Sequence, residues 1–309
     1  MRGFSYRTMT GNVGKSRAFA EVGFVVMWSS GFIGATLGTQ EASTPTFQAW
    51  RSFLAAGVLL AAVLLFRRRW PSLGEVAVQG TVGFLAQGVY LSGVVGAVEF
   101  GVSAGTTALV AALQPLLAAA LAGPVLGERV RARQWVGLIV GLVGVVLVVG
   151  GDMQVKEQVP GESAAPLWAY ALPFVAMAGL VVATLVERRT SLKTKLETPL
   201  DVALAIQCAV STVLFAVMAM FWGGLEPPGG GQFWLAVLWG VVFATFGGYG
   251  FYWLNLKLSS VSRVSSLIYL TPPTTMVWAY LMFGESVTLL AILGLAVCFG
   301  GVLLASRGA

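Results

Sequence analysis

Ten apolar stretches of transmembrane length limit the fold of this sequence more than any other feature. A hydrocarbon core about 30 Å thick requires roughly 20 apolar residues from each helix that crosses it. The predicted spans cover residues 19–38, 47–66, 76–98, 102–123, 134–150, 167–187, 200–222, 233–254, 262–283 and 287–306. Only 10% of the 309 residues are charged, which is too few to cover the surface of a soluble protein. The sequence therefore predicts an all-α membrane protein with ten transmembrane helices.

Basic residues alternate between the connections that join these spans. The N-terminal tail and the even connections carry most of the Lys and Arg, as in residues 67–69 and 129–133, whereas Lys156 is the one basic residue of the odd connections. Cytoplasmic loops are enriched in Lys and Arg. This pattern predicts that both termini are cytoplasmic and that the protein lies in the plasma membrane, the inner membrane in a bacterium. The net charge of +6 then reflects topology, and no nucleic-acid partner is expected.

The chain matches itself at an offset of 157 residues. Pro115 aligns with Pro272, and the Gly-Glu pair at residues 127–128 aligns with the pair at 284–285. Each half then holds five spans, and because five is odd, the second half must cross the membrane in the opposite direction. The sequence therefore predicts two inverted five-helix repeats, an architecture typical of alternating-access transporters with a substrate site near the midplane.

The repeat also defines the expected domain organisation. A cytoplasmic tail covers residues 1–17, the first repeat with helices 1–5 covers 18–150, an external linker covers 151–166, and the second repeat with helices 6–10 covers 167–309.

Several function classes are disfavoured by missing residue types. The sequence contains no histidine, which excludes Ser-His and Cys-His nucleophiles and histidine metal sites. Cys208 and Cys298 lie in apolar runs without metal-ligand spacing, so no metal or cofactor is expected. The Gly-Lys-Ser at residues 14–16 lacks the earlier glycine of a phosphate-binding loop. The sequence thus predicts neither an enzyme nor an ATPase subunit, and transport energy would come from gradients.

Five motifs of the chain resemble those of a known family. A proline lies in the fourth helix of each half, a Gly-Glu turn precedes each fifth helix, and the fifth helices carry spaced glycines; residues 28–32 read Trp-Ser-Ser-Gly-Phe and residues 50–53 read Trp-Arg-Ser-Phe. This set is similar to the ten-helix EamA-type transporters of the drug/metabolite transporter superfamily. The overall pattern looks most like the YddG-type exporters, and that resemblance implies aromatic amino acids as substrates.

Polar and aromatic side chains at helical spacing form the candidate substrate site. Such residues either line a cavity or bond across helices and fasten the bundle. The predicted substrate-binding residues are Trp28, Ser29, Gln87, Tyr90, Thr107, Gln114, Thr245, Tyr249, Tyr252, Ser265 and Tyr269. Neutral acceptors and aromatic rings suit a zwitterion with an apolar or aromatic side chain.

Arg51 is a cation within the predicted second span, and such a residue is usually paired and often functional. We expect it to pair with Glu41 or Glu99 near the external mouth, either as a structural pair or as a gate or carboxylate site. Pro115, Pro272 and Pro273 interrupt helices at mid-depth in both halves, and they are predicted to act as hinges.

These observations favour a secondary transporter, an exporter or facilitator, that moves small amphipathic metabolites by alternating access across the lipid bilayer. Aromatic and other apolar amino acids are the expected substrates. The alternatives are a nucleotide-sugar or cationic-drug transporter of the same fold, and a channel or receptor that does not transport. Because no Asp or Glu is placed in the middle of a span, we expect facilitated diffusion rather than proton coupling.

Overall fold

The structure is a computed structural model that describes residues 7–118, 121, 132–158, 165–194, 198–258 and 267–306. Within these ranges the chain is helical apart from turns and short connections, and none of the described residues forms a strand. The helices of the first half are α1 (Arg7–Thr39), α2 (Thr44–Leu65), α3 (Leu73–Gly83), η1 (Phe84–Val89), α4 (Tyr90–Glu99), α5 (Ala104–Ala111) and α7 (Ala132–Gln158). Those of the second half are η2 (Leu167–Ala171), α8 (Leu172–Thr194), α9 (Leu200–Phe221), α10 (Gly231–Trp239), η3 (Gly240–Gly247), α11 (Gly248–Leu258), α13 (Thr271–Phe283) and α14 (Leu289–Ser306).

The described helices match the ten predicted spans. Seven helical segments are long and apolar enough to cross a membrane, and two shorter apolar helices cover Ala104–Ala118 and Leu289–Leu304. Together with α13 they make ten. Large apolar side chains point outward from them, as Leu65, Ile139 and Leu281 show with exposed fractions of 77%, 60% and 72%. Lipid is the solvent that such a surface requires, so the chain is an integral membrane protein.

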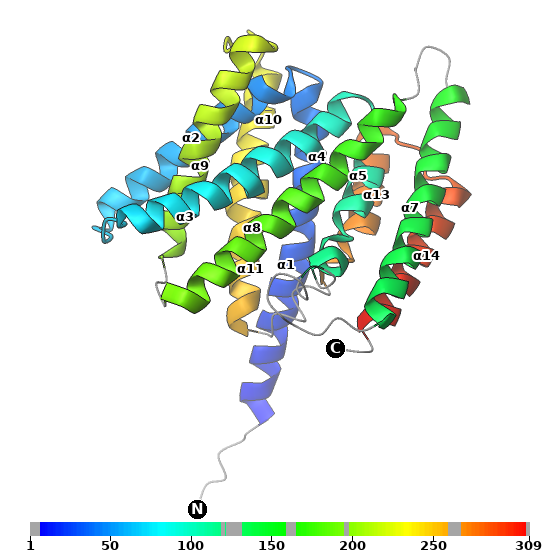
Figure 1. Cartoon of the computed structure of the whole chain (residues 1–309), viewed down its shortest axis with the longest axis horizontal. Helices are drawn as coiled ribbons and strands as arrows, with labels where there is room; N and C mark the ends of the chain where they lie inside the picture. Colours follow the sequence, from blue (N-terminus) through cyan, green and yellow to red (C-terminus); the bar gives the residue numbers. More distant parts are fainter. Residues whose placement is uncertain are drawn as a thin grey trace, which may run out of the picture.

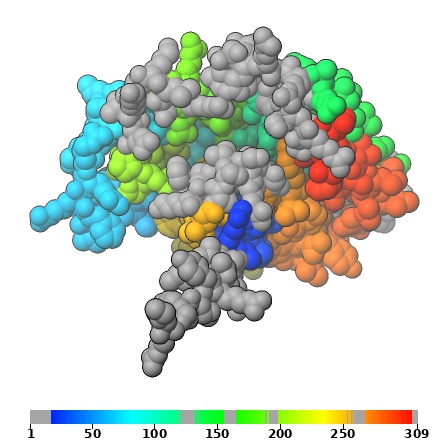
Figure 2. Space-filling view, turned by 90° about the horizontal axis from the view of Figure 1, so that it is seen from below, coloured from blue at the N-terminus to red at the C-terminus, as the bar shows by residue number. Residues whose placement is uncertain are grey.

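The helix α1 stands in the middle of the bundle. It packs against η3 and α11 on one side and against α13 on another, and Figure 2 shows the part of α1 that is coloured blue between the gold α11 and the orange α13. The helix α8 lies in the same way along α3, η1 and α4 (Figure 1). The sixth span thus contacts the third as the first contacts the eighth, which is the relation that two inverted repeats produce.

The helices α7 and α14 form a close pair at one end of the bundle (Figure 1). An added Cβ at Gly144 would lie 2.6 Å from the carbonyl oxygen of Gly294, and one at Gly294 would lie 2.5 Å from the carbonyl oxygen of Gly144. The thiol of Cys298 donates to the carbonyl of Gly141 over 3.2 Å, across a separation of 157 residues. Residues that the repeat equates therefore meet at this crossing, and the glycines allow the backbones to touch.

The third and eighth spans each contain a π-helical segment, which the sequence patterns did not predict. Adding 157 to the bounds of η1 gives 241–246, which falls inside η3 (Gly240–Gly247). A π-helical turn widens a helix by one residue and is frequent at functional sites. The two repeats thus carry the same irregularity at the same place.

The fourth and ninth spans are broken at equivalent positions. Residues 112–113 and 269–270 are turns, and helix resumes directly after each of them. Pro272 and Pro273 lie in the first turn of α13, where the missing N–H of proline costs no helical bond. Pro115 is the second residue of the stretch that follows the first break. The prolines therefore begin new helical stretches at mid-span; their role as hinges stays a prediction.

Local sequence also explains where shorter helices begin. The Ser72 hydroxyl accepts from the Glu75 backbone N–H, and the Glu75 carboxylate accepts from the Ser72 backbone N–H over 2.8 Å. This capping box satisfies two N–H groups that a helix start leaves free. Arg69 lies 2.6 Å from the same carboxylate. The Ser103 hydroxyl caps α5 by accepting from the Thr106 N–H.

Candidate functional site

A cavity of about 60 Å³ lies where spans 1, 2, 3 and 8 meet, between the two repeats. Its wall comes from α1, α2, η1 with α4, and η3 with α11. The lining residues are Trp28, Gly31, Phe32, Arg51, Ala86, Gln87, Tyr90, Leu91, Val94, Val95, Ala244, Thr245 and Tyr249. Both π-helical segments border this cavity, so the irregular turns and the candidate site coincide.

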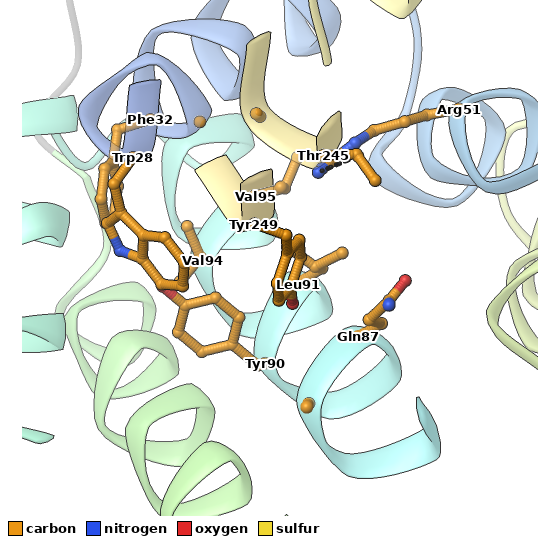
Figure 3. A pocket seen from close by; sticks show the side chains of 13 residues that line it. Trp28, Phe32, Arg51, Gln87, Tyr90, Leu91, Val94, Val95, Thr245 and Tyr249 are labelled. Atoms are coloured by element: carbon orange, nitrogen blue, oxygen red, sulfur yellow. Dashed lines mark hydrogen bonds between the residues drawn. The ribbon is translucent and has the colours of Figure 1, made fainter. Parts of the chain in front are cut away.

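One part of the cavity is aromatic. The ring centroids of Trp28 and Tyr249 are 5.9 Å apart in an edge-to-face arrangement, and Phe24 packs behind Trp28 at 5.4 Å. In Figure 3 Trp28 and Phe32 lie on one side of the cavity, and the ring of Tyr90 extends toward Trp28. Such edges and faces receive another aromatic ring through offset or edge-to-face contact.

The other part of the cavity is polar. Arg51 donates from Nη1 to Oε1 of Gln48 over 3.2 Å and from Nη2 to Oγ1 of Thr245 over 3.1 Å. The Thr245 hydroxyl itself donates to the Gly240 carbonyl over 2.9 Å, which leaves its lone pairs to Arg51. Figure 3 shows the Arg51 guanidinium bonded to Thr245, on the side of the cavity where Gln87 also lies.

The predicted pairing of Arg51 with Glu41 or Glu99 is wrong. Glu99 accepts from the Thr44 backbone N–H over 2.8 Å and so caps the start of α2. Among the residues described here, Arg51 has no carboxylate within ion-pair distance. Glu41 and Glu99 were predicted because they lie at a similar distance from the membrane surface as Arg51, but the Arg51 side chain points toward η3. A cation at the centre of a span costs roughly 2.5–3.5 kcal/mol on translocon scales, and among the described residues only neutral oxygens bond to Arg51.

A chain of hydrogen-bonded glutamines leads to the cavity, and two of its members, Gln79 and Gln207, were not predicted. Gln207 on α9 donates to Oε1 of Gln79 over 2.8 Å, and Gln87 donates to Oε1 of Gln207 over 3.3 Å. All three side chains are buried. The Cys208 thiol lies 3.4 Å from Oε1 of Gln87. The 157-residue offset gave no signal for Gln79 or Gln207, because it pairs Gln207 with Trp50 and Gln79 with Ala236.

Five of the eleven predicted substrate residues line the cavity, namely Trp28, Gln87, Tyr90, Thr245 and Tyr249. Tyr252 lies one turn away, with its ring centroid 6.3 Å from that of Trp28. Arg51, predicted as a gate or structural pair, lines the cavity as well.

The other predicted residues lie elsewhere or outside the described chain. The Ser29 hydroxyl donates to the Thr271 carbonyl over 3.3 Å and fastens α1 to α13. Thr107 is fully buried in α5, and Gln114 is half-buried just after the break at 112–113. Tyr269 borders a separate small cavity with Leu109 and Pro272. Ser265 is not among the described residues.

Comparison with known proteins places the chain in a family. The profile of the EamA-like transporter family matches residues 18–150 and 167–307. The uncharacterized inner membrane transporter YedA of Escherichia coli K12 is 32% identical over 127 residues, which are 41% of this chain and 41% of that protein. The uncharacterized transporter YdfC of Bacillus subtilis is 24% identical over 289 residues, 89% of this chain and 86% of that one.

Two further matches extend the comparison. A WAT1-related chloroplastic protein of Arabidopsis thaliana is 25% identical over 82% of this chain and 60% of its own length. A crystal structure with 21% identity superposes with a TM-score of 0.64 and covers 96% of this chain and 99% of its own; at this identity it supports the fold alone. The family profile covers both predicted repeats and most of the chain. This chain is therefore a member of the EamA-like transporter family, within the drug/metabolite transporter superfamily.

Proposed function

We propose that this transporter moves amino acids with aromatic or other apolar side chains by alternating access through the cavity between its repeats. The observation that carries the proposal is the division of that cavity into two unlike sides. Arg51, Thr245 and Gln87 form a polar side, and Trp28 and Phe32 form an aromatic side. A charged carboxylate bonds well to a guanidinium, while an aromatic or aliphatic side chain suits the ring-lined part.

The size of the cavity fits an occluded or partly closed state. Its volume of about 60 Å³ holds a few water molecules but lies below the roughly 300–1,000 Å³ of ligand pockets. A substrate therefore enters only when the wall opens. The segments η1 and η3 border the cavity, and a helix changes its hydrogen-bond register at a π-helical turn at low cost because the ladder is already interrupted there.

The charge of the described lining favours this substrate class over its competitors. Nucleotide sugars require several cations for their phosphates, whereas Arg51 is the one cation among the lining residues described. A cationic drug would be repelled by Arg51 and finds no Asp or Glu among those same residues. Because that lining offers no carboxylate to carry a coupled proton, we propose that substrate moves by facilitated diffusion.

Orientation follows from the Lys and Arg distribution. The residues that flank even connections are basic, so we propose that both termini are cytoplasmic. A facilitator in this orientation exports its substrate when the cytoplasmic concentration is the higher one.

The test is uptake of radiolabelled tryptophan, phenylalanine and alanine into proteoliposomes that contain only this protein, without an ion gradient. Saturable equilibration with preference for tryptophan and phenylalanine is the expected result. Uptake equal to that of empty liposomes refutes the proposal, and accumulation driven by an imposed pH gradient refutes facilitated diffusion. Arg68→Gln serves as a charge-matched control for Arg51→Gln, since Arg68 pairs with Asp201 at 2.6 Å outside the cavity.

A further inference from the structure

The described lining of the cavity contains an unbalanced positive charge, which influences the substrates that the cavity can recognise. Among the thirteen residues that line it, Arg51 is the only one with a formal charge. The two acceptors bonded to Arg51, Gln48 and Thr245, are neutral. They use two of the five N–H donors of a guanidinium. Arg51 is therefore held in place but not neutralised by the described lining.

Acidic side chains of the neighbouring helices have other partners. Glu99 caps α2 through the Thr44 N–H, Glu75 bonds Arg69 and Ser72, and Asp201 bonds Arg68. Glu187, on α8, is exposed. None of these four carboxylates lines the cavity. Among the described residues no carboxylate pairs with Arg51, so a substrate carboxylate can serve as its counter-ion.

The ammonium of an amino acid finds no acidic partner among the described residues that line the same cavity. Oε1 of Gln87 accepts from the Cys208 thiol, and the amide N–H of Gln87 donates to Oε1 of Gln207. For a cation the described lining offers the rings of Trp28, Tyr90 and Tyr249, through the modest cation–π attraction, and the neutral oxygens of Gln87 and the two tyrosines, but no carboxylate. A zwitterion leaves the occupied cavity with one net positive charge, whereas a monoanion makes it neutral. Because an uncompensated charge away from water is costly, the neutral complex is the favoured one.

We infer that the cavity recognises the carboxylate and the ring of its substrate and not the amino group, so that aromatic monocarboxylates without an ammonium are ligands of the same site. This inference rests on the proposed function, because it concerns the same cavity, and it extends the substrate class from amino acids to aryl-substituted carboxylic acids. It also makes Arg51 the residue that determines specificity, with Gln48 and Thr245 as the residues that position it.

The test uses three probes that share a phenyl ring and a carbon chain of the same length between the ring and the charged group. Phenylalanine carries both charges, 3-phenylpropanoate lacks the ammonium, and 2-phenylethylamine lacks the carboxylate. Their binding is measured by isothermal titration calorimetry on the full chain in lipid nanodiscs, where membrane permeability of the free acid has no influence. We expect 3-phenylpropanoate to bind at least as tightly as phenylalanine, and 2-phenylethylamine to bind at least about tenfold more weakly.

Variants of Arg51 test whether binding of the two carboxylates depends on this residue. Arg51→Gln is expected to abolish binding of both carboxylates, and Arg51→Lys to retain part of it, since a lysine keeps the charge but not the two-pronged donor geometry. Arg68→Gln removes a cation outside the cavity and is expected to bind like the wild type. The comparison of the three probes on the wild-type protein requires no variant, so an unstable Arg51→Gln does not weaken the test.

The outcomes separate the two proposals. Binding and transport of phenylalanine without binding of 3-phenylpropanoate overturns this inference and leaves the proposed function in place. Equal loss of affinity in Arg51→Gln and Arg68→Gln overturns it too, because the effect would then be one of overall charge. Binding of 2-phenylethylamine alone, or of none of the probes, overturns both proposals.

Discussion

The close crossing of α7 and α14 predicts whether a substitution of a glycine at the contact raises or lowers the stability of the protein. An added Cβ at Gly144 would lie 2.5 Å from Sγ of Cys298 and 2.6 Å from the carbonyl oxygen of Gly294, whereas ordinary contacts begin at 3.4 Å. Gly144→Ala therefore requires the two helices to separate by about 0.8 Å, and a gap of that size forfeits a quarter to a half of each dispersion contact. In lipid, such packing is the main force between helices.

The magnitude follows from two opposing effects. Overpacking of a close contact costs about 1–3 kcal/mol, while alanine in place of glycine in a helix returns about 0.5–1 kcal/mol. Gly144→Ala should thus destabilise the protein by about 0.5–2 kcal/mol. Gly150, on the same helix, has no atom within 4 Å of an added Cβ, so Gly150→Ala receives only the helical gain and should be slightly stabilising.

The assay is the apparent melting temperature of both variants in one detergent, followed by the loss of the monodisperse peak in size-exclusion chromatography. We expect Gly144→Ala to melt below the wild type and Gly150→Ala at or above it. If Gly144→Ala were as stable as Gly150→Ala, the backbone contact between the repeats would not exist as described.

Three further predictions concern the site and its supports. Thr245→Val removes the acceptor that positions Arg51 and should weaken phenylalanine binding by about five- to tenfold in calorimetry, whereas Thr245→Ser should bind normally; equal affinities would contradict the positioning role. Glu99→Ala removes the cap of α2 and should cost roughly 0.5–2 kcal/mol of thermal stability, against no more than about 0.5 kcal/mol for Glu41→Ala; a reversed order would count against the cap. Gln207→Leu takes a partner from each of two buried amides and should lower stability by about 1–3 kcal/mol, a result that an unchanged melting temperature would refute.

The sequence predicted the architecture well because the signals for it are long and redundant. Ten apolar stretches and one repeat offset determine ten helices in two halves, and an error of a few residues at a boundary changes neither. The interruptions of spans four and nine were visible as prolines, since Pro272 and Pro115 align at the offset. The π-helical segments were not visible, because a single extra residue in a helical turn leaves hydrophobic periodicity almost unchanged.

The site was predicted only in part, for a geometric reason. Helical periodicity tells which residues share a face, but it does not tell which neighbour covers that face. Thr107 and Tyr269 therefore qualified by pattern, although the cavity lies between other spans. The pairing of Arg51 failed for the same reason, because depth in the membrane limits the candidates and the direction of the side chain selects among them. Gln48, three residues before Arg51 and on the same face, was the partner that spacing alone indicates.

The most direct test of the account is a structure of the protein bound to 4-bromophenylalanine, with the bromine located by its anomalous scattering. We expect one bromine peak in the cavity, beside Trp28 and Tyr90, with the carboxylate within hydrogen-bond distance of the Arg51 guanidinium. A ligand that occupies another part of the molecule and leaves this cavity empty would contradict the assignment of the site. A ligand in the cavity with its ammonium, rather than its carboxylate, directed at Gln87 and Arg51 would contradict the role given to Arg51.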